Sequence, residues 1–125
     1  MRVFPLLSVV SASLCCALLG ACDANQAALP VTGGDARLGK LLIEQYQCGS
    51  CHAIPDVAAA TGNAGPPLLG FGRRSYIAGS IPNMPDALVN WLVDPPALKP
   101  GTLMPNVGVS KDDARHMAAY LYTLR

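Results

Sequence analysis

Cys48-Gly49-Ser50-Cys51-His52 is the stretch of sequence that decides how this chain folds. Two thiols at this spacing can each add across one vinyl group of the same porphyrin, and C-x-x-C-H is the pattern of covalent haem attachment. The imidazole that follows is then held under the iron, where it can bind as an axial ligand. The sequence therefore predicts one haem c, bound through Cys48 and Cys51, with His52 as a metal ligand.

Two other interpretations of paired cysteines have less support. A thioredoxin-like redox pair needs a strand-helix-strand context, whereas helical patterns flank this motif and no strand-rich run precedes it. A structural zinc site needs four ligands. His116 alone cannot complete one, because the remaining cysteines all lie in an N-terminal leader: Cys15, Cys16 and Cys22.

The N-terminus has the pattern of a secretory leader. Arg2 precedes an apolar stretch over residues 4–19, which is to be excluded from the fold. Leu19-Gly20-Ala21-Cys22 resembles a bacterial lipobox, in which the cysteine becomes the first mature residue and carries lipid. We therefore expect residues 1–21 to be a lipoprotein-type signal peptide. The alternative is an uncleaved anchor, although the run is short for a spanning helix.

Residues 22–34 are rich in Ala, Asn, Gly and Pro, which predicts a lipidated flexible tether. More than one hydrocarbon chain on Cys22 would attach the protein stably to a membrane. We therefore expect an exported protein, anchored to the bacterial plasma membrane and facing the periplasm or the cell exterior.

The remaining domain, residues 35–125, is small and nearly neutral. The chain has nine basic and eight acidic side chains, and no basic cluster exceeds Arg73-Arg74, so nothing favours nucleic-acid binding. A core of about 90 residues is marginal without a staple. A buried porphyrin supplies a large apolar surface, and we expect the apo form to be poorly folded.

The first and last helices are predicted to pack on each other. Residues 35–47 form the first helix, with Asp35 as its N-cap, and residues 111–124 form the last, with Ser110 in a capping box. Gly39 costs helix stability, so we expect it to allow close approach of the last helix. The apolar positions at helical spacing are Leu38, Leu42, Ile43 and Tyr46 in the first helix, and Ala114, Met117, Ala118, Leu121 and Leu124 in the last.

A further helix is predicted over residues 84–93. Asn83 can cap it, and Asp94-Pro95-Pro96 ends it. Leu88, Trp91 and Leu92 mark its buried side. Loops rich in Gly and Pro separate the helices, and no strand pattern of convincing length is found.

The second axial ligand has few candidates. Met104 lies in Pro100-Gly101-Thr102-Leu103-Met104-Pro105, a loop that can present a thioether to the iron. Met84, framed by Asn83 and Pro85, is the rival, and an open site or a Met104 that merely fills a core gap are the alternatives. Met117 is expected in the core and His116 in solvent.

Together these residues resemble a class I mono-haem cytochrome c of the membrane-anchored bacterial lipoprotein type. The resemblance covers about Asp35 to Arg125 and rests on C-x-x-C-H, Gly65-Pro66-Pro67-Leu68-Leu69-Gly70, the Pro-Gly-Thr-x-Met-Pro loop and the closing Ala-Tyr-Leu helix. It implies an all-α domain of three to five helices around a covalently bound haem, with the N- and C-terminal helices crossing at Gly39.

The resemblance also implies roles for single residues near the haem. The Pro66 carbonyl would accept the imidazole N–H and raise the basicity of His52. Leu68 and Trp91 would lie beside the porphyrin, with core filling as the alternative for Trp91. Arg73 or Arg74 would pair with a haem propionate, with a solvated surface pair as the alternative.

The predicted function is one-electron transfer. A His/Met ligand pair leaves no vacant position on the iron, so we expect neither an enzyme nor a small-molecule substrate. The partners would be redox proteins, because the domain looks similar to cytochrome c domains that accompany terminal oxidases. The alternatives are a haem sensor or peroxidase-like enzyme with an open distal site, and a structural oxidase subunit whose haem is only a folding staple.

Overall fold

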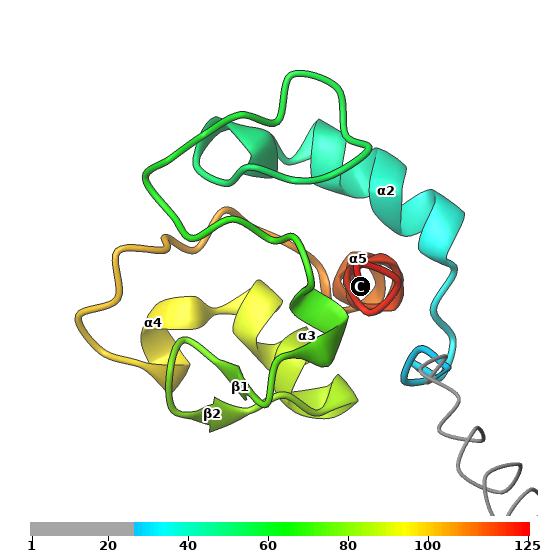
Figure 1. The fold of residues 1–125 in the computed structure, drawn as a ribbon. Helices are drawn as coiled ribbons and strands as arrows, with labels where there is room; N and C mark the ends of the chain where they lie inside the picture. The colour runs from blue at the N-terminus through cyan, green and yellow to red at the C-terminus, as the bar shows by residue number, and fades with distance from the viewer. Residues whose placement is uncertain (1–26) are drawn as a thin grey trace, which may run out of the picture.

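Helices provide most of the regular structure in the computed structural model, which describes residues 27–125 (Figure 1). The expected mainly helical architecture is confirmed. The helices are α2 (Ala36–Gln45), α3 (Pro85–Val93), α4 (Pro95–Leu98) and α5 (Lys111–Leu121), with 3₁₀ turns η1 (Cys48–Ser50) and η2 (Phe71–Arg73). Of these helices, all within residues 27–125, none is long and apolar enough to cross a membrane. The predicted signal peptide and Cys22 lie outside the described residues.

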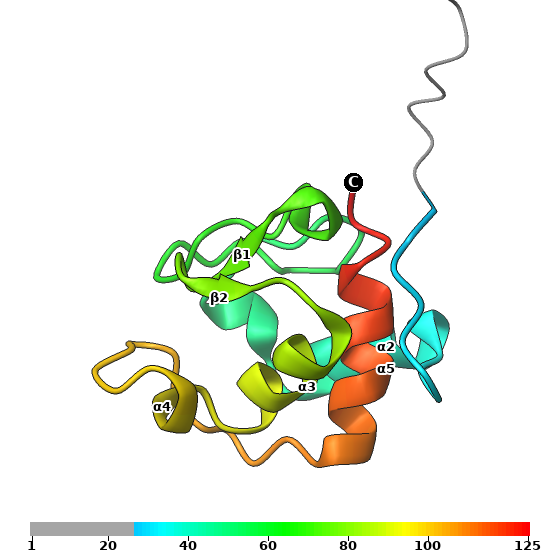
Figure 2. The same cartoon turned by 90° about the horizontal axis from the view of Figure 1, so that it is seen from below.

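α2 and α5 cross in direct contact, as Figures 1 and 2 show. Gly39 is buried at the crossing, where an added Cβ would overlap the backbone carbonyl of His116. The packing reason predicted for Gly39 is therefore confirmed. At one end of the contact, the Tyr46 hydroxyl donates to Asp113 at 2.8 Å.

The helices α2 and α5 each begin at a side chain that caps them. The carboxylate of Asp35 accepts from the amides of Arg37 and Leu38, which caps α2. The backbone amides of Leu38 and Arg37 hold the pKa of the Asp35 carboxyl below its usual value. The Ser110 hydroxyl accepts from the Asp113 amide, which caps α5 as predicted.

The core lies between α2, α3 and α5. Met117 and its α5 neighbours Ala114 and Ala118 are fully buried, and the predicted apolar sides of α3 and α5 face this core. Leu38 differs from its prediction, because it is substantially exposed on the outer side of α2. His116 also differs from the solvent-exposed prediction. It is half-buried, and its Nδ1 accepts from the Asp35 amide at 2.9 Å.

The predicted cap of α3 is wrong. Met84 occupies the N-cap position without a side-chain cap bond, whereas Asn83 turns into the core. The side-chain nitrogen Nδ2 of Asn83 donates to the carbonyls of Phe71 (3.2 Å) and Arg74 (2.9 Å). Its side-chain oxygen Oδ1 accepts from the Tyr122 hydroxyl (3.1 Å). Asn83 thus joins the loop before α3 to the end of α5.

Three short features depart from the predicted boundaries. Pro95 starts the single helical turn α4 directly after α3, since proline suits a first turn. α5 ends at Leu121 rather than 124, and beyond this end the Leu124 carbonyl accepts from the Gly72 amide at 2.8 Å. Two antiparallel two-residue strands, β1 (Tyr76–Ile77) and β2 (Ile81–Pro82), form a small hairpin.

The segment before α2 packs against α5 (Figure 2). Val31 is partly buried against the core, and an added Cβ on Gly34 would lie 2.8 Å from the Cβ of Ala119. The Arg125 guanidinium donates to the Ala27 carbonyl at 2.6 Å. The described part of the expected tether, residues 27–34, therefore contacts the domain.

Candidate haem site

The C-x-x-C-H motif forms a tight turn directly after α2. Gln47 has a left-handed conformation (φ 57°) and begins η1. The amides of Cys51 and His52 both donate to the Cys48 carbonyl, at 3.2 and 3.0 Å. Cys51 is exposed and Cys48 is half-buried, and burial raises the pKa of the Cys48 thiol. The turn presents two thiols and one imidazole on five consecutive residues.

The His52 imidazole is oriented by a backbone carbonyl. His52 Nδ1 lies 2.7 Å from the Pro66 carbonyl oxygen. A carbonyl oxygen can only accept, so Nδ1 carries the proton and Nε2 keeps its lone pair free. This is the hydrogen bond that the resemblance implied, and it leaves His52 in the tautomer that binds a metal through Nε2.

Backbone hydrogen bonds hold the loop that carries Pro66 against the motif. The Gly65 amide donates to the Cys51 carbonyl at 2.8 Å, and the Leu68 amide donates to the Ala53 carbonyl at 2.8 Å. An added Cβ on Gly65 would overlap the His52 ring. Gly65 is therefore needed for the close approach of the loop, a role that the sequence analysis did not assign to it. The position of Gly65 immediately before Pro66 was the feature of the sequence that could have indicated this role.

Met104 lies in the loop between α4 and α5. It is half-buried against the core, whereas the preceding residue, Leu103, is 93% exposed. The Met104 amide donates to the Thr102 hydroxyl at 3.3 Å. The Lys99 ammonium donates to the Ala78 carbonyl at 2.6 Å and so ties the start of this loop to the β1–β2 hairpin.

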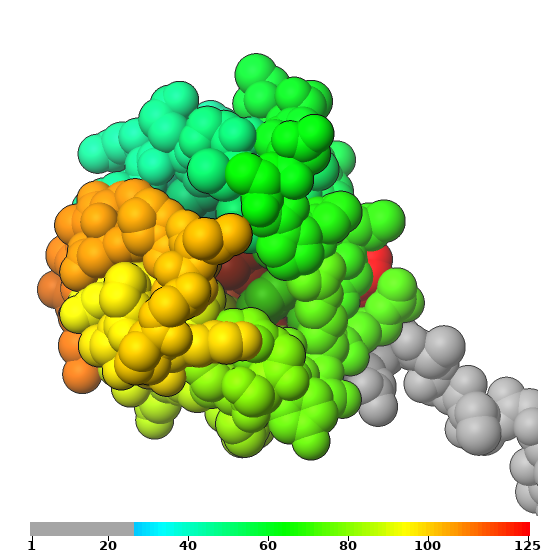
Figure 3. Space-filling view, turned by 90° about the vertical axis from the view of Figure 1, so that its left-hand side faces the viewer, coloured from blue at the N-terminus to red at the C-terminus, as the bar shows by residue number. Residues whose placement is uncertain are grey.

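The two loops border one hollow in the surface (Figure 3). The teal-to-green chain that includes the motif forms one side, the gold-to-orange chain that includes Met104 forms the other, and dark red α5 is visible at the bottom. The segments on its two sides carry paired thiols, an imidazole and a thioether, and this set of groups fits a covalently attached haem. Within residues 27–125, no three His, Cys, Asp or Glu side chains gather as a metal-binding group.

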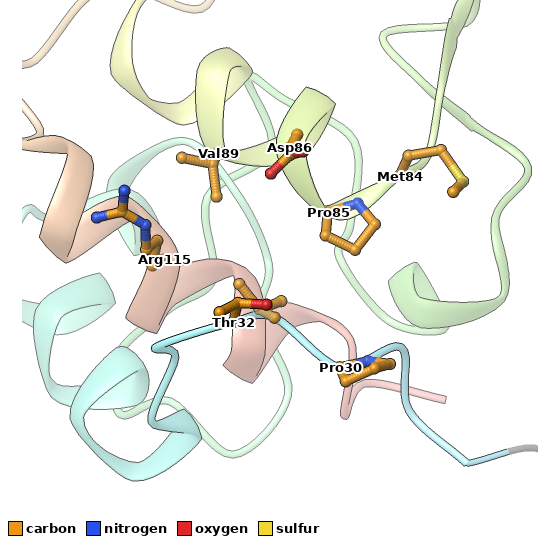
Figure 4. Close-up of a pocket in the computed structure, with 8 residues that line it drawn as sticks. Pro30, Thr32, Met84, Pro85, Asp86, Val89 and Arg115 are labelled. Carbon is orange, nitrogen blue, oxygen red and sulfur yellow. The ribbon is translucent and has the colours of Figure 1, made fainter.

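The rival methionines lie elsewhere. Met84 is 56% exposed and lines a separate pocket with Pro30, Thr32, Val89 and Arg115 (Figure 4). None of those residues belongs to the motif or to the loop that carries Pro66. Met117 is fully buried within α5. Of the three candidates that the sequence analysis considered, Met104 alone is in the loop that borders the hollow.

The remaining predicted site residues differ in their surroundings. Trp91 is 7% exposed on α3, and Leu68 is half-buried against the core. Arg73 is exposed at the end of η2. The Arg74 guanidinium instead contacts the carbonyls of Pro67 and Leu69. Arg73 is thus the freer of the two candidates for a propionate.

Comparison with known proteins gives one family and several relatives. Residues 36–125 match the sequence model of the family Cytochrome c. The chain is 36% identical over 91 residues to cytochrome c oxidase subunit 2 of Alkalihalophilus pseudofirmus, covering 72% of this chain and 26% of the relative. It is 33% identical over 89 residues to cytochrome c oxidase subunit 2 of Bacillus subtilis, covering 70% and 25%. The chain thus spans about a quarter of the length of these relatives.

Proposed function

The chain belongs to the cytochrome c family, and we propose that it carries single electrons on one haem whose iron is bound by His52 and Met104. Membership of the family implies a covalently attached haem c and a role in electron transfer. One copy of C-x-x-C-H, at residues 48–52, supports a single haem. The observation that carries the proposal is the 2.7 Å contact between His52 Nδ1 and the Pro66 carbonyl.

The chain's own side chains would control the haem in three ways. When bound, the haem supplies reversible one-electron exchange between ferric and ferrous iron. His52 and Met104 would bind the iron from opposite sides, and this pair raises the reduction potential relative to two imidazoles. The Pro66 carbonyl fixes the His52 ring and increases its basicity. Apolar surroundings that include Leu68 and Trp91 would disfavour the iron state with the higher net charge.

Two axial side chains leave no iron position for a substrate. We therefore propose that the protein is an electron-transfer protein rather than an enzyme, with other redox proteins as its partners. Contacts of this kind are small and short-lived.

The relatives suggest what kind of partner to test. Three curated relatives are cytochrome c oxidase subunit 2, and this chain corresponds to about a quarter of each. We propose that the domain delivers electrons to a terminal oxidase, either as a separate carrier or as a bound subunit.

The N-terminal sequence supports a proposal for the location of the protein. We propose export, cleavage before Cys22 and lipid attachment at that cysteine, so that the domain lies at the outer face of the plasma membrane. The supporting pattern is Leu19-Gly20-Ala21-Cys22. Tethering would raise the effective concentration of the domain near membrane-bound partners.

The axial ligand is tested by replacing each methionine in turn. Met84→Leu serves as the matched control for Met104→Leu. We expect the weak long-wavelength sulfur-to-iron band of the ferric protein in the wild type and in Met84→Leu. Met104→Leu should lose this band and have a lower reduction potential. A band that survives in Met104→Leu and disappears in Met84→Leu would show that the assignment is wrong.

Two further measurements separate the alternatives. Rapid binding of carbon monoxide to the ferrous wild type would favour a sensor or peroxidase-like protein with an open distal site. Electron transfer from the reduced domain to a purified terminal oxidase, with and without lipid, tests the carrier role. A domain that keeps its haem but passes no electrons would favour a purely structural haem.

A further inference from the structure

The Arg74 side chain binds the carbonyl groups of the residues immediately before and after Leu68. Its Nη2 donates to the carbonyl oxygen of Pro67 and, at 3.2 Å, to that of Leu69. Its guanidinium carbon lies 5.6 Å from the centre of the Phe71 ring, which is within the range of a cation–π contact. The side chain therefore folds back onto its own loop.

The backbone of Arg74 is itself well fixed. Its amide donates to the Phe71 carbonyl at 3.0 Å. Its carbonyl accepts from the side-chain nitrogen of Asn83 at 2.9 Å. The side-chain oxygen of Asn83 accepts in turn from the hydroxyl of the fully buried Tyr122. The guanidinium thus extends from a rigid base to the loop.

The Pro66–Pro67 segment cannot hold itself through its own amides. Proline has no backbone N–H and has a φ angle locked by its ring, and the peptide bond is planar. The Pro66 carbonyl can therefore turn only if Pro67 moves with it. A donor that fixes the Pro67 carbonyl also restrains the Pro66 carbonyl, which lies 2.7 Å from His52 Nδ1.

We propose that Arg74 is a positioning residue for the His52 imidazole, acting through the Pro66–Pro67 segment. This inference rests on the proposed ligation of iron by His52. A well-placed carbonyl strengthens the bond from Nδ1 and makes Nε2 a better electron donor to the metal. Without Arg74, the carbonyl is less well placed, the imidazole donates less strongly, and ferrous iron is favoured.

Arg37 gives a matched control, because its side chain is exposed on α2, carries the same charge and has no role at the haem site. Arg74→Met and Arg37→Met each remove one guanidinium. We expect the His52 Nδ1 proton of the ferrous protein to exchange with solvent roughly fivefold faster in Arg74→Met, the size of effect given by one lost hydrogen bond. Arg37→Met should match the wild type. NMR measures this exchange.

A redox titration gives an independent readout. The reduction potential of Arg74→Met should be more positive than that of Arg37→Met, since the imidazole of Arg74→Met is the weaker donor to the iron. Thermal unfolding of both variants measures any general loss of stability separately. Equal proton exchange and equal potentials in the two variants would overturn the proposal.

Arg74→Lys keeps the test decisive if Arg74→Met does not accumulate with haem. Lysine keeps the charge but lacks the planar fork of donors. Proton exchange faster than in Arg37→Lys supports the proposal, and equal exchange overturns it. If the wild-type iron has no imidazole ligand, the proposed function itself fails. If the ligand is present and the Arg74 variants behave like the Arg37 variants, only this inference fails.

Discussion

Tyr122 is a fully buried phenol in a network of hydrogen bonds. Its hydroxyl donates to Asn83 Oδ1 at 3.1 Å, and the Asn83 amide reaches the carbonyls of Phe71 and Arg74. Burial raises the pKa of Tyr122 to about 12. Because Arg74 contacts the loop that carries Pro66, this network extends from the end of α5 to the surroundings of His52.

Replacing Tyr122 by phenylalanine tests the network. Tyr122→Phe leaves Asn83 Oδ1 buried without its donor, and we expect a loss of about 1–3 kcal/mol in the free energy of unfolding. Urea unfolding at pH 7 measures it. Tyr76→Phe is the control, since Tyr76 is exposed, and its effect should stay within about 0.5 kcal/mol.

The pH dependence has a defined direction. The folded-state pKa of Tyr122, about 12, lies above the ordinary value of about 10. The stabilising contribution of the protonated phenol is therefore complete below about pH 10 and lost as the pH rises through 12. The difference in unfolding free energy between the wild type and Tyr122→Phe should shrink over this range. A difference that stays constant would contradict the role given to Tyr122.

At the scale of single residues, the sequence predicts the roles of those residues whose chemistry requires a fixed spacing. The Cys48, Cys51 and His52 motif is read directly, because two thioether bonds and one axial ligand need that order. Asn83 was wrongly predicted as a cap, since an amide before a helix looks the same whether it caps or turns inward. Its partner, Tyr122, is distant in the sequence and meets it only in the folded chain.

The crossing of α2 and α5 is the main contact between helices. Gly39 lies against the backbone of His116 there. Backbone atoms cannot move aside as a flexible side chain can, so an added methyl group must push the helices apart. The crossing is therefore sensitive to a single carbon atom.

Gly39→Ala should destabilise the protein although alanine favours a helix by about 1 kcal/mol. We expect a net loss of about 1–3 kcal/mol, the usual cost of overpacking, measured by urea unfolding of the holoprotein. Leu41→Ala is the control on the same helix, because Leu41 is 60% exposed. Equal stability of Gly39→Ala and the wild type would show that the crossing can relax.

Helices of two turns or more could be predicted from periodicity, and shorter elements could not. α2, α3 and α5 were predicted within a few residues of their bounds. α4 and the β1–β2 hairpin are too short for a periodic pattern. The end of α5 was misplaced because apolar residues continue at helical spacing to Leu124, whereas the amides of Thr123 and Leu124 donate three residues back in tighter turns.

The whole molecule has a small core and a hollow between two loops (Figure 3). The loop with Pro66 and the loop with Met104 are rich in Gly and Pro and contain little regular structure of their own. A bound porphyrin would cover apolar side chains of both. The family, and hence the fold, could be predicted from the motif and these loops. The packing of residues 27–34 could not, because their composition is that of a linker.

Removal of the haem tests whether the folded core depends on the bound porphyrin. The double variant Cys48→Ser with Cys51→Ser cannot form either thioether bond. We expect its helical circular-dichroism signal to fall well below that of the holoprotein and its urea unfolding to lose cooperativity. Met104→Leu, which keeps both thioether bonds, should remain folded. A haem-free double variant with full helicity and cooperative unfolding would contradict the view that the haem completes the core.

The Arg125 to Ala27 hydrogen bond brings the end of the chain next to its first described residue. A segment that enters a domain beside the residues that leave its last helix lets the domain be joined to another polypeptide at one point of its surface. The same proximity is what a circular permutation requires. Joining Arg125 to Ala27 through a short linker and reopening the chain in an exposed loop should preserve this architecture.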